Sequence, residues 1–282
     1  MTDSIAQDDA AQEDTAGDGP EALTFNPRTP NSARMWNYWV GGKDNYAADR
    51  AAAEAVMRAF PALPVIARQA RRFLGDVVQQ LAAAHGVRQF LDIGTGLPTA
   101  DNTHEIAQRM APDSRVLYVD NDPVVLAHAR ALLTSAPDGK TDFIQADLRD
   151  TATILAQAAR TLDLSQPVAI LLIAVLHFIS EEDDPYAIVA RLMDAMPAGS
   201  YLAIGHAASD IRPQDTQQGF RTYNERSPVK LTPRSRQQID RLVAGLDPVG
   251  PGVVPLSEWF EQDPLGSGGA DLVGYCGLLR KP

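Results

Sequence analysis

Hydrophobic residues recur at helical spacing over a stretch that begins near position 32, and few large hydrophobic side chains precede it. Because residues three and four apart share one face of a helix, this recurrence predicts amphipathic helices. Gly41-Gly42 separates the first helix from the second, and prolines at 61 and 64 separate the second from the third. The predicted helices cover residues 33–40, 47–60 and 65–84, with no strand-like alternation among them.

From Val87 onwards, short β-type runs alternate with helical stretches. This alternation predicts a mostly parallel sheet with helices on both faces. The run 168–173 is hydrophobic throughout, as expected of a central strand buried on both sides. Regularity lapses over 207–232. The predicted strands cover 89–93, 115–119, 141–145, 167–173 and 201–206, with two more near 253–255 and 272–279, and the predicted helices cover 102–110, 123–133, 151–161, 185–196 and 233–244.

These patterns predict an α/β, Rossmann-like fold whose sheet has seven strands, preceded by a helical cap. We divide the chain into a disordered acidic tail at 1–27, a cap or lid at 28–84 and a core at 85–282. The tail is expected to be disordered because it has too little hydrophobic surface to offset the entropy lost on ordering.

Charge and composition narrow the classes of function. The net charge is −11, and the tail supplies seven acidic residues and no basic one, so the remaining chain is only mildly acidic. Nucleic-acid binding rests largely on Lys and Arg, so this balance argues against a nucleic-acid partner. A single cysteine, Cys276, excludes an internal disulfide, and the histidines show no metal-ligand spacing, so no metal is expected.

Targeting signals are also missing from the pattern. The longest hydrophobic run, 168–179, is too short to span a bilayer, and the first ten residues show no feature of a signal peptide. We therefore expect no membrane partner and a cytoplasmic location. The sequence leaves open whether the chain is a monomer or a homodimer.

The most informative stretch is the glycine loop at the end of the first predicted strand, in FLDIGTGLP (90–98). Gly94, Thr95 and Gly96 lie where open α/β sheets bind ligands, and glycines let the backbone approach a ligand closely. A dinucleotide fingerprint would require a third glycine where this chain has Thr99. This argues against NAD(P), while a tight turn without any ligand remains an alternative.

Two acidic residues follow at the ends of the next two predicted strands. Asp120, in YVDND, lies where an acid accepts both ribose hydroxyls of an adenosyl group. Asp147, in QADLRD, can accept from an adenine amino group, and Leu148 can cover the ring. A single Asp at such a place is more often a cap or turn residue, as we expect for Asp122. The three strand ends together favour adenosine held across the edge of the sheet.

FLDIGTG, YVDND and ADLRD resemble motifs one to three of class I S-adenosylmethionine methyltransferases. The chain from Pro30 onwards is also similar to an actinobacterial family of S-adenosyl methyltransferases, formerly a domain of unknown function. This similarity is carried by PNSARMWNYWVGGKDNYAADRAAAE (30–54), LDIGTGLPTADNTHEIAQ and AVLHFI. The resemblance implies a class I methyltransferase fold, S-adenosylmethionine as cofactor and S-adenosylhomocysteine as product. It implies methyl transfer to an unidentified acceptor, which we expect to be a small molecule.

The resemblance also implies roles for individual residues. Asp92 would lie near the cofactor's amino group, Asn121 beside the adenine, and Ala174 and Val175 beneath the sulfonium. Asn102 is either a helix cap or a contact at the methionine end. The cofactor-binding residues predicted in the core are Asp92, Gly94, Thr95, Gly96, Asn102, Asp120, Asn121, Asp147, Leu148, Ala174 and Val175. His177 is the candidate catalytic residue; it could orient an acceptor, act as general base, or be a satisfied interior histidine.

The segment WNYWVGGKDNYAADR supplies a second set of candidates. We expect Tyr38, Gly42, Asn45 and Tyr46 to contact the cofactor from a lid over the sheet, with Arg50 near its carboxylate. An ordinary amphipathic helix is the alternative. The stretch 207–232 is predicted to be an irregular acceptor-binding flap, whose arginines suggest an acceptor with negative charge.

Three other functions remain open at this point. The first is an NAD(P)-dependent oxidoreductase, which Thr99 and Asp147 argue against. The second is a protein that binds S-adenosylmethionine as a sensor without catalysis. The third is an enzyme of another reaction class that uses the same cofactor on the same fold.

Overall fold

The computed structural model describes residues 26–132, 134–260 and 272–282. Its centre is one seven-stranded sheet in the order β3-β2-β1-β4-β5-β7-β6. The pairs among β1 to β5 are parallel, whereas β7 is antiparallel to both β5 and β6. The predicted mostly parallel, seven-stranded sheet is therefore confirmed. The strands are β1 Gln89–Ile93, β2 Arg115–Asp120, β3 Lys140–Gln145, β4 Ala169–Ile173, β5 Tyr201–His206, β6 Asp247–Pro255 and β7 Tyr275–Arg280.

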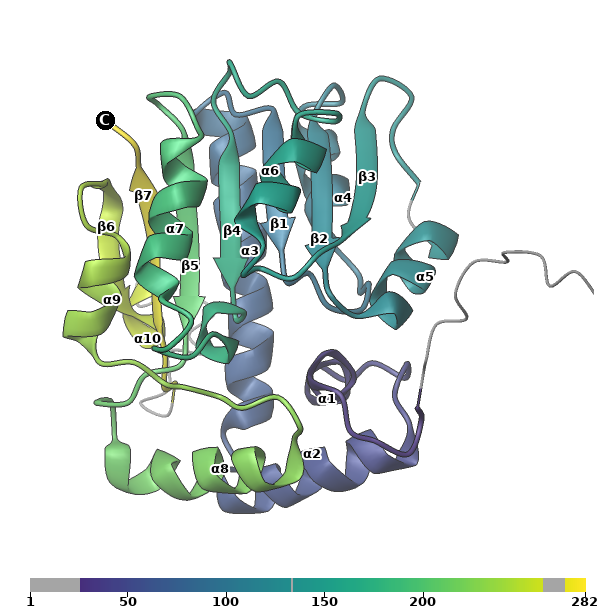
Figure 1. Cartoon of the computed structure of the whole chain (residues 1–282), viewed down its shortest axis with the longest axis vertical. Helices are drawn as coiled ribbons and strands as arrows, with labels where there is room; N and C mark the ends of the chain where they lie inside the picture. The colour runs from purple at the N-terminus through teal and green to yellow at the C-terminus, as the bar shows by residue number, and fades with distance from the viewer. Residues whose placement is uncertain (1–25, 133, 261–271) are drawn as a thin grey trace, which may run out of the picture.

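Helices cover both faces of this sheet. Figure 1 shows α6 and α7 in front of the strands and α3 behind them. The helices are α1 Ser32–Trp39, α2 Ala47–Ala59, α3 Leu63–Ala84, α4 Thr103–Met110, α5 Pro123–Leu132, α6 Thr151–Ala158, α7 Pro185–Asp194, α8 Pro213–Arg226, α9 Arg236–Leu242 and α10 Leu256–Trp259, with a short 3-10 turn, η1, at Leu176–Phe178. In the described residues, no helix is both long and apolar enough to cross a membrane. The expected tail lies almost wholly outside the described residues.

The described residues form two hydrophobic clusters. The larger one joins the sheet to its covering helices and includes Phe73 and Val77 of α3. The smaller one lies below the sheet in Figure 1 and joins Met35, Trp39 and Val56 of α1 and α2 to Tyr223 of α8. Helix α3 takes part in both, because it extends past the sheet and brings Ala67 into the smaller cluster. We refer to α1, α2 and α8 together as the cap.

The prediction of an irregular flap at 207–232 is wrong, because residues 213–226 form helix α8. It packs along α2 and completes the cap (Figure 1). The helix was not predicted because its sequence is strongly polar and carries Gly219 in its middle. This glycine is required by packing, since a Cβ there would lie 2.7 Å from Phe60 Cβ. The arginines of the segment, Arg212, Arg221 and Arg226, are exposed.

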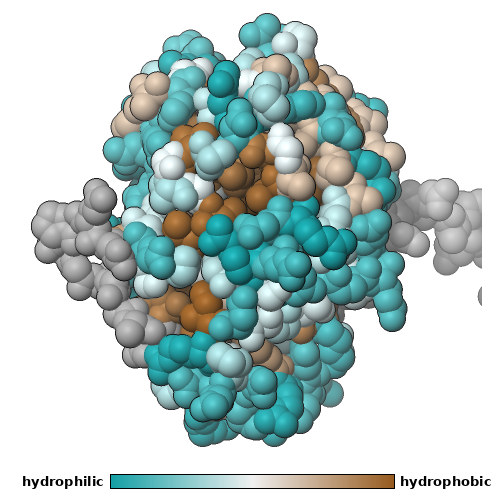
Figure 2. Space-filling model, turned by 90° about the vertical axis from the view of Figure 1, so that its left-hand side faces the viewer, coloured by the Kyte–Doolittle hydropathy of each residue, from teal (hydrophilic) through white to brown (hydrophobic). Residues whose placement is uncertain are grey.

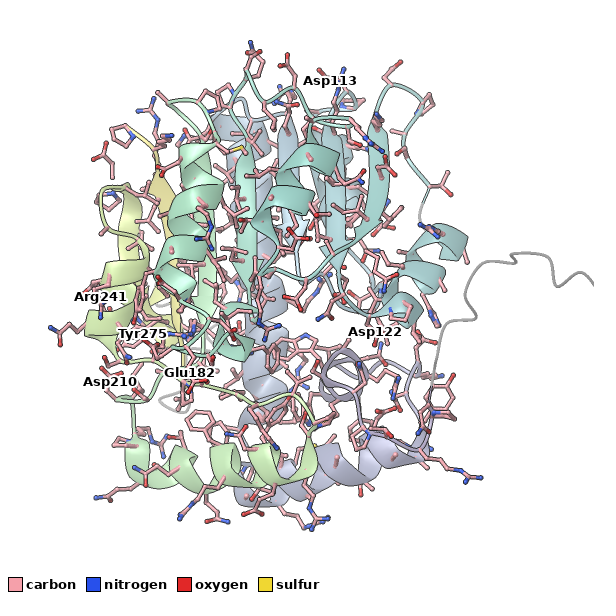
Figure 3. All side chains as sticks on the ribbon, viewed as in Figure 1. Asp113, Asp122, Glu182, Asp210, Arg241 and Tyr275 are labelled. Carbon is pink, nitrogen blue, oxygen red and sulfur yellow. The ribbon has the colours of Figure 1, made fainter. Side chains whose placement is uncertain are left out.

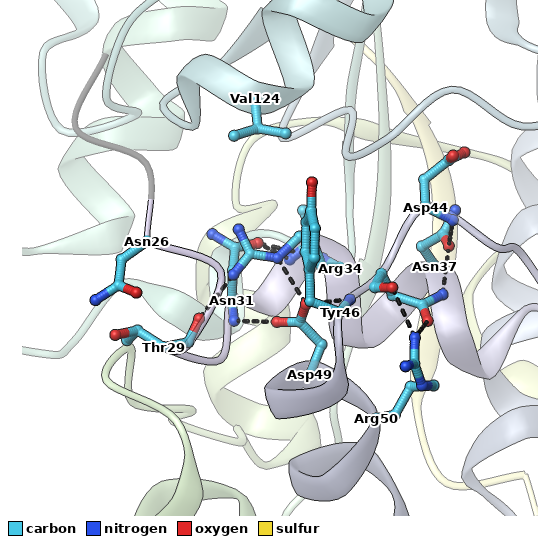
Figure 4. A network of polar contacts seen from close by, with 12 residues as sticks. Asn26, Thr29, Asn31, Arg34, Asn37, Asp44, Tyr46, Asp49, Arg50 and Val124 are labelled. Atoms are coloured by element: carbon cyan, nitrogen blue, oxygen red, sulfur yellow. Dashed lines mark hydrogen bonds and ion pairs between the residues drawn. The ribbon is translucent and has the colours of Figure 1, made fainter. Parts of the chain in front are cut away.

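A buried polar network fixes the turn between α1 and α2 (Figure 4). Arg34 donates through Nε to Asp49 Oδ2 at 2.7 Å, and both side chains are almost fully buried. Asp49 also accepts from the backbone N–H groups of Asn31, at 2.9 Å, and Tyr46, at 2.8 Å. Asn37 Oδ1 accepts from the Asp44 N–H and from Asn45 Nδ2. The α1–α2 unit is therefore held by specific polar contacts as well as by hydrophobic packing.

The outer surface is mainly polar on the side of β6 and α8. Figure 2 shows this side as largely hydrophilic, interrupted by two hydrophobic areas with a hydrophilic band between them.

Candidate functional site

A cavity of about 550 Å³ lies between the sheet and the cap. The carboxyl ends of the parallel strands face this cavity. Asp122, just past the end of β2, lies at the edge near the cap in Figure 3, and Asp113, before the start of β2, lies at the opposite edge. Residues following β1, β2, β3, β4 and β5 all line the cavity, so the topology brings together segments far apart in the sequence.

The glycine loop forms the floor of the cavity at the end of β1. Gly94 has φ +75°, and a Cβ there would lie 2.4 Å from Val175 Cγ2. Gly96 has φ +65°, and nothing lies within 4 Å of the place its Cβ would take. Gly94 thus permits close packing of β1 against the segment after β4, whereas Gly96 leaves open space where a ligand can approach the backbone.

Asp92 is the next-to-last residue of β1, just before this loop, and is buried beside the cavity. Its Oδ2 accepts a hydrogen bond from Thr103 Oγ1 at 2.6 Å. Burial raises the pKa of Asp92 to about 6, and the Thr103 hydrogen bond and the nearby Arg71 oppose this rise only in part. The carboxylate is therefore short of counter-charge, which suits it to a cationic group of a ligand.

Asp120 ends β2 with its carboxylate at the cavity. Oδ2 accepts from the Gly96 N–H at 2.9 Å, and Oδ1 accepts from the Asp122 N–H at 2.9 Å. Burial raises the pKa of Asp120 to about 6, and these backbone hydrogen bonds oppose the rise. Two N–H groups hold the carboxylate in place while each oxygen keeps a lone pair for a ligand hydroxyl.

The adjacent strand end carries Asp147, Leu148 and Asn121 close together. Asn121 Nδ2 donates to Asp147 Oδ2 at 3.4 Å, and Leu148 is buried beside them. Arg149 donates to Asp147 at 2.8 Å and is also paired with Asp183 at 3.1 Å. This corner offers one hydrophobic surface with an amide and a carboxylate at its edge, which fits a heteroaromatic ring with an amino group.

The segment after β4 closes the cavity on its other side. Ala174 has φ +60°, a conformation that costs energy for a residue with a Cβ, and it lines the cavity with Val175. Its N–H donates to Gly205 O at 2.9 Å, which ties this sharp turn to β5. The 3-10 turn η1 follows at once and brings His177 to the cavity.

Two buried histidines, His177 and His206, differ in their partners. His206 Nδ1 contacts Ala207 O at 2.9 Å, and its Nε2 lies 2.9 Å from Arg234 Nη1. Both nitrogens are satisfied when Nδ1 carries the proton, and burial lowers the pKa of His206 to about 3. His177 Nδ1, by contrast, is buried with no hydrogen-bond partner within the part of the chain that the structure describes. Burial, then His206 and Arg234, lower the pKa of His177 well below its usual value.

The cap wall of the cavity is aromatic. Trp36 and Trp39 of α1 face it together with Phe178 of η1 and Tyr223 of α8. Neighbouring ring centroids lie 6.3 Å apart for Trp36 and Trp39, 6.4 Å for Trp39 and Tyr223, and 6.1 Å for Tyr223 and Phe178. The rings therefore form a continuous wall opposite the strand ends.

The structure brings most predicted core residues to one place. Those that line the cavity are Asp92, Gly94, Thr95, Gly96, Asp120, Asn121, Asp147, Leu148, Ala174, Val175 and His177. Asn102 does not; it caps α4 in a capping box with Glu105. Asn102 lines a small adjoining pocket with Arg71 and Asp92.

The predicted cap residues do not line the cavity. The Tyr38 hydroxyl donates to Glu54 Oε1 at 3.0 Å, and Asn45 binds Asn37. A Cβ at Gly42 would meet the Asn37 side chain, so this glycine serves packing of the turn. Tyr46 lies over Arg34, with its hydroxyl pointing toward Val124 across the gap to α5 (Figure 4). Helical geometry explains this for Tyr38, because Ser32, Trp36 and Trp39 share the face of α1 that meets the cavity. Contact of these four residues with the cofactor stays a prediction.

Sequence reasoning missed several lining residues. Arg71 reaches the strand ends from the middle of α3, whereas the exposed Arg50 binds Asn45. The spacing of Trp36 and Trp39 was a signal for one aromatic helix face, but nothing in the sequence linked it to Tyr223.

Among the described residues, no group of three or more His, Cys, Asp or Glu side chains could hold a metal ion.

A parallel sheet of this order, with a glycine loop and acids at three adjacent strand ends, defines an adenosyl-binding α/β protein of the class I methyltransferase type. The chain belongs to the S-adenosyl methyltransferase family, whose model matches residues 20–282. Its cofactor is therefore S-adenosylmethionine, as the sequence motifs predicted. The opening at Gly96 together with Asp120 and Asp147 fits an adenosyl group, and Asp92 fits an amino group. No curated protein matches the chain.

Two solved structures from actinobacteria are similar over nearly the whole chain. One is a DUF574 family protein from Streptomyces avermitilis MA-4680, with 43% identity and a TM-score of 0.86, covering 90% of this chain and 98% of that one. The other is a candidate methyltransferase from Thermobifida fusca YX, with 37% identity and a TM-score of 0.84, covering 93% of this chain and 98% of that one. The predicted family and fold are thus confirmed.

Proposed function

We propose that the chain is a methyltransferase that transfers a methyl group by direct displacement to a small-molecule acceptor enclosed beneath the cap. The observation that carries this proposal is one continuous cavity that joins the strand ends, with Asp92, Asp120 and Asp147, to the aromatic wall of the cap. One end has the polar groups that an adenosyl compound needs, and the other end is hydrophobic and walled. Cavities of this size hold small molecules.

At the polar end, Asp120 accepts the ribose hydroxyls, and Asp147 with Asn121 holds the edge of the adenine above Leu148. Asp92 faces the amino group of the methionine portion, and Arg71 is placed to pair with its carboxylate. Thr95 and the two glycines carry the backbone past the ligand. These roles are supported by the lining of the cavity and by the short supply of counter-charge at Asp92 and Asp120.

When bound, the cofactor supplies an electrophilic methyl group: a lone pair of the acceptor forms the bond to the methyl carbon, and the carbon–sulfur bond breaks with its electrons left on sulfur. The chain contributes orientation and an enclosed environment. Val175 and the turn at Ala174 fix the boundary between the two ends of the cavity. The aromatic wall keeps water away from the reacting groups.

A small acceptor is favoured over a macromolecule because α1 and α8 close over the strand ends. The smaller hydrophobic cluster holds both helices in place, so a large acceptor would have to displace Trp39 and Tyr223 from their packing. The chain beyond the acidic tail is also mildly acidic and offers little attraction to nucleic acid.

Binding and turnover test the proposal separately. Calorimetry should show binding of S-adenosylmethionine and S-adenosylhomocysteine, with NAD at least tenfold weaker. A panel of small acceptors, read by release of S-adenosylhomocysteine, should then give turnover with at least one class. If both cofactor forms bind but no acceptor in a chemically broad panel causes release of S-adenosylhomocysteine, a sensor function would be favoured. Equal binding of NAD would contradict the assignment of the three acids.

A further inference from the structure

We propose that the acceptor is an uncharged, flat aromatic compound whose hydroxyl group donates a hydrogen bond to the imidazole of His177 and receives the methyl group. This inference rests on the proposed function and names the class of molecule that the hydrophobic end of the cavity takes. It is carried by an unpartnered buried histidine, a buried cation behind it and a wall of rings beside it.

His177 has hydrogen-bonding capacity that the described protein does not use. The residue is only 5% exposed and lines the cavity, and its Nδ1 has no partner among the described residues. Buried polar groups in native proteins are nearly always paired, so the imidazole of this cavity-lining residue has capacity left for a partner such as a ligand group. A neutral imidazole has one acceptor nitrogen, and a hydroxyl in the cavity would supply the donor.

The surroundings hold His177 neutral and in place. Arg234 is fully buried and donates to Leu176 O at 2.9 Å and Ile179 O at 2.7 Å, which fixes both sides of the η1 turn. The same guanidinium lies 2.9 Å from His206 Nε2, and the His206 ring lies 5.6 Å from that of His177. Arg234 is thus a positioning residue for His177.

The charge of Arg234 also discriminates between acceptor types. Its counter-ion, Glu181, is 2.8 Å away but 45% exposed, so the inner side of the guanidinium is poorly neutralised. Burial is the main cause that lowers the pKa of His177, and His206 and the positive charge of Arg234 lower it further. A cationic amine would be repelled there, whereas a hydroxyl oxygen that loses its proton during methyl transfer would be stabilised.

The aromatic wall sets the shape of the acceptor. The chain of rings from Trp39 through Tyr223 to Phe178 ends at His177, which lies 4.4 Å from Phe178 between ring centroids. Flat rings pack favourably against such surfaces in stacked or edge-on geometry. Lys230, which also lines the cavity, donates to Asn224 O and Ser227 O. Its ammonium group is therefore already engaged by backbone carbonyls and offers little to a ligand carboxylate.

In the transfer step, the acceptor oxygen bonds to the methyl carbon and the methyl–sulfur bond breaks. The hydroxyl proton moves toward the His177 imidazole and then leaves to solvent. His177 is a weak base in this environment, so we assign it mainly the orientation of the hydroxyl, with a lone pair of the oxygen directed at the methyl group.

Four naphthalene derivatives test the inference with the full chain saturated with S-adenosylhomocysteine. They are 2-naphthol, 2-fluoronaphthalene without a donor, decahydro-2-naphthol without planarity and 1-naphthylmethylammonium with a positive charge. Binding is followed by calorimetry and by quenching of tryptophan fluorescence, since Trp36 and Trp39 line the cavity. We expect 2-naphthol to bind about 5- to 10-fold more tightly than 2-fluoronaphthalene, the effect of about one neutral hydrogen bond. It should also bind more tightly than the non-planar alcohol, which cannot stack on the rings, and than the ammonium ion, which the positive potential repels.

Variants assign the preference to His177. His177→Phe should bind 2-naphthol and 2-fluoronaphthalene equally, whereas His177→Gln, which keeps an acceptor, should retain part of the preference. His128→Phe is the matched control, because His128 does not line the cavity and binds Val124 O. With S-adenosylmethionine, 2-naphthol should release S-adenosylhomocysteine faster in the parent chain than in His177→Phe.

Two outcomes would overturn the inference while leaving the proposed function intact: tightest binding of the ammonium probe, or an unchanged preference in His177→Phe. If S-adenosylhomocysteine bound neither the parent chain nor any of the variants, that result would instead contradict the proposed function.

Discussion

A Cβ on Gly94 would lie 2.4 Å from Cγ2 of Val175, so the glycine loop after β1 and the turn after β4 fit together only because residue 94 lacks a side chain. Real Cβ atoms essentially never lie this close to another heavy atom. The floor of the cavity thus depends on one contact between two neighbouring strands.

Replacement of Gly94 should therefore destabilise the fold far more than replacement of Gly96. Gly94→Ala should lower the affinity for S-adenosylmethionine by more than tenfold or unfold the loop, because the new methyl group must displace Val175. Gly96→Ala is the matched control for the fold: its φ is also positive, but nothing lies within 4 Å of its Cβ position, so no protein atom must move. Thermal melting without ligand compares the two. Gly94→Ala combined with Val175→Ala should recover part of the lost stability, and equal effects of the two single variants on melting would contradict the packing argument.

Asp120 carries the predicted ribose contact. Asp120→Ala should reduce the affinity for S-adenosylmethionine roughly ten- to hundredfold, since a lost hydrogen bond to a charged group costs about 1.5–3 kcal/mol. The fold should persist because the residue ends β2 and its partners are only the N–H groups of Gly96 and Asp122. Titration calorimetry measures the affinity, and circular dichroism checks the fold. Unchanged binding would show that the ribose lies elsewhere.

The affinity should also depend on pH through this carboxylate. The pKa of Asp120 in the free protein is raised to about 6 by burial, so the group gains a proton as the pH falls through 6 and can no longer accept two ribose hydroxyls. We expect binding of S-adenosylhomocysteine to weaken between pH 7 and pH 5. Asp120→Asn should bind weakly throughout and show a shallower slope, and the part that remains is due to Asp92, whose pKa is also raised to about 6. An unchanged slope in Asp120→Asn would contradict the role of Asp120.

Asp92 should strengthen ligand binding but lower the stability of the free protein. Its folded pKa of about 6 exceeds the ordinary 3.8, so the folded state binds the proton more tightly and stability falls as the pH rises from about 4 to about 6. Above pH 6, the buried charge costs up to about 3 kcal/mol. Asp92→Asn should therefore melt higher than the parent at pH 7.5 and equally at pH 4, since the Thr103 hydroxyl can accept from the new amide. Its affinity for S-adenosylmethionine should be lower. A lower melting temperature at pH 7.5 would contradict this assignment.

The cap should be needed for binding, and residues 1–25 should be dispensable. A chain that starts at Asn26 should bind the cofactor like the full chain. A chain that starts at Ala55 loses Met35 and Trp39 from the smaller hydrophobic cluster and should bind far more weakly or fail to fold. Arg34→Ala gives a sharper test: removing one partner of a buried ion pair typically costs about 3–5 kcal/mol, because Asp49 would stay buried without its cation. Full affinity in the chain from Ala55 would show that the cap is not a lid.

The sheet and the polar half of the site could be predicted because their signals are local in the sequence. Asp92, Asp120 and Asp147 each follow a hydrophobic run, and parallel strands bring their ends to one edge whatever else the chain does. Strand β6 was predicted only at its end, because a register shift between Val249 and Val254, with positive φ at Gly250 and Gly252, breaks the alternation.

The other half of the site depends on tertiary packing. Arg71 lies on a helix whose pattern shows only which face is buried, and its reach to the strand ends follows from the length and direction of α3. Tyr223 and Gly219 belong to a helix that is almost wholly polar in sequence and is held by contact with α2. The position of His177 depends on Arg234, which holds the η1 turn and comes 57 residues later in the chain. No window of local sequence contains these relationships.

The smaller hydrophobic cluster has a consequence for the chain as it is made. Tyr223 follows Val56 by 167 residues, so the cap helices at the beginning of the chain are synthesised long before the helix that covers them. At about 5–20 residues per second, Trp39 and its neighbours wait roughly 10–30 s for α8 to emerge. During that interval a ribosome-bound chain presents an exposed aromatic surface. A chaperone that recognises such surfaces would thus meet the nascent protein first at the segment that later closes over its methyl acceptor.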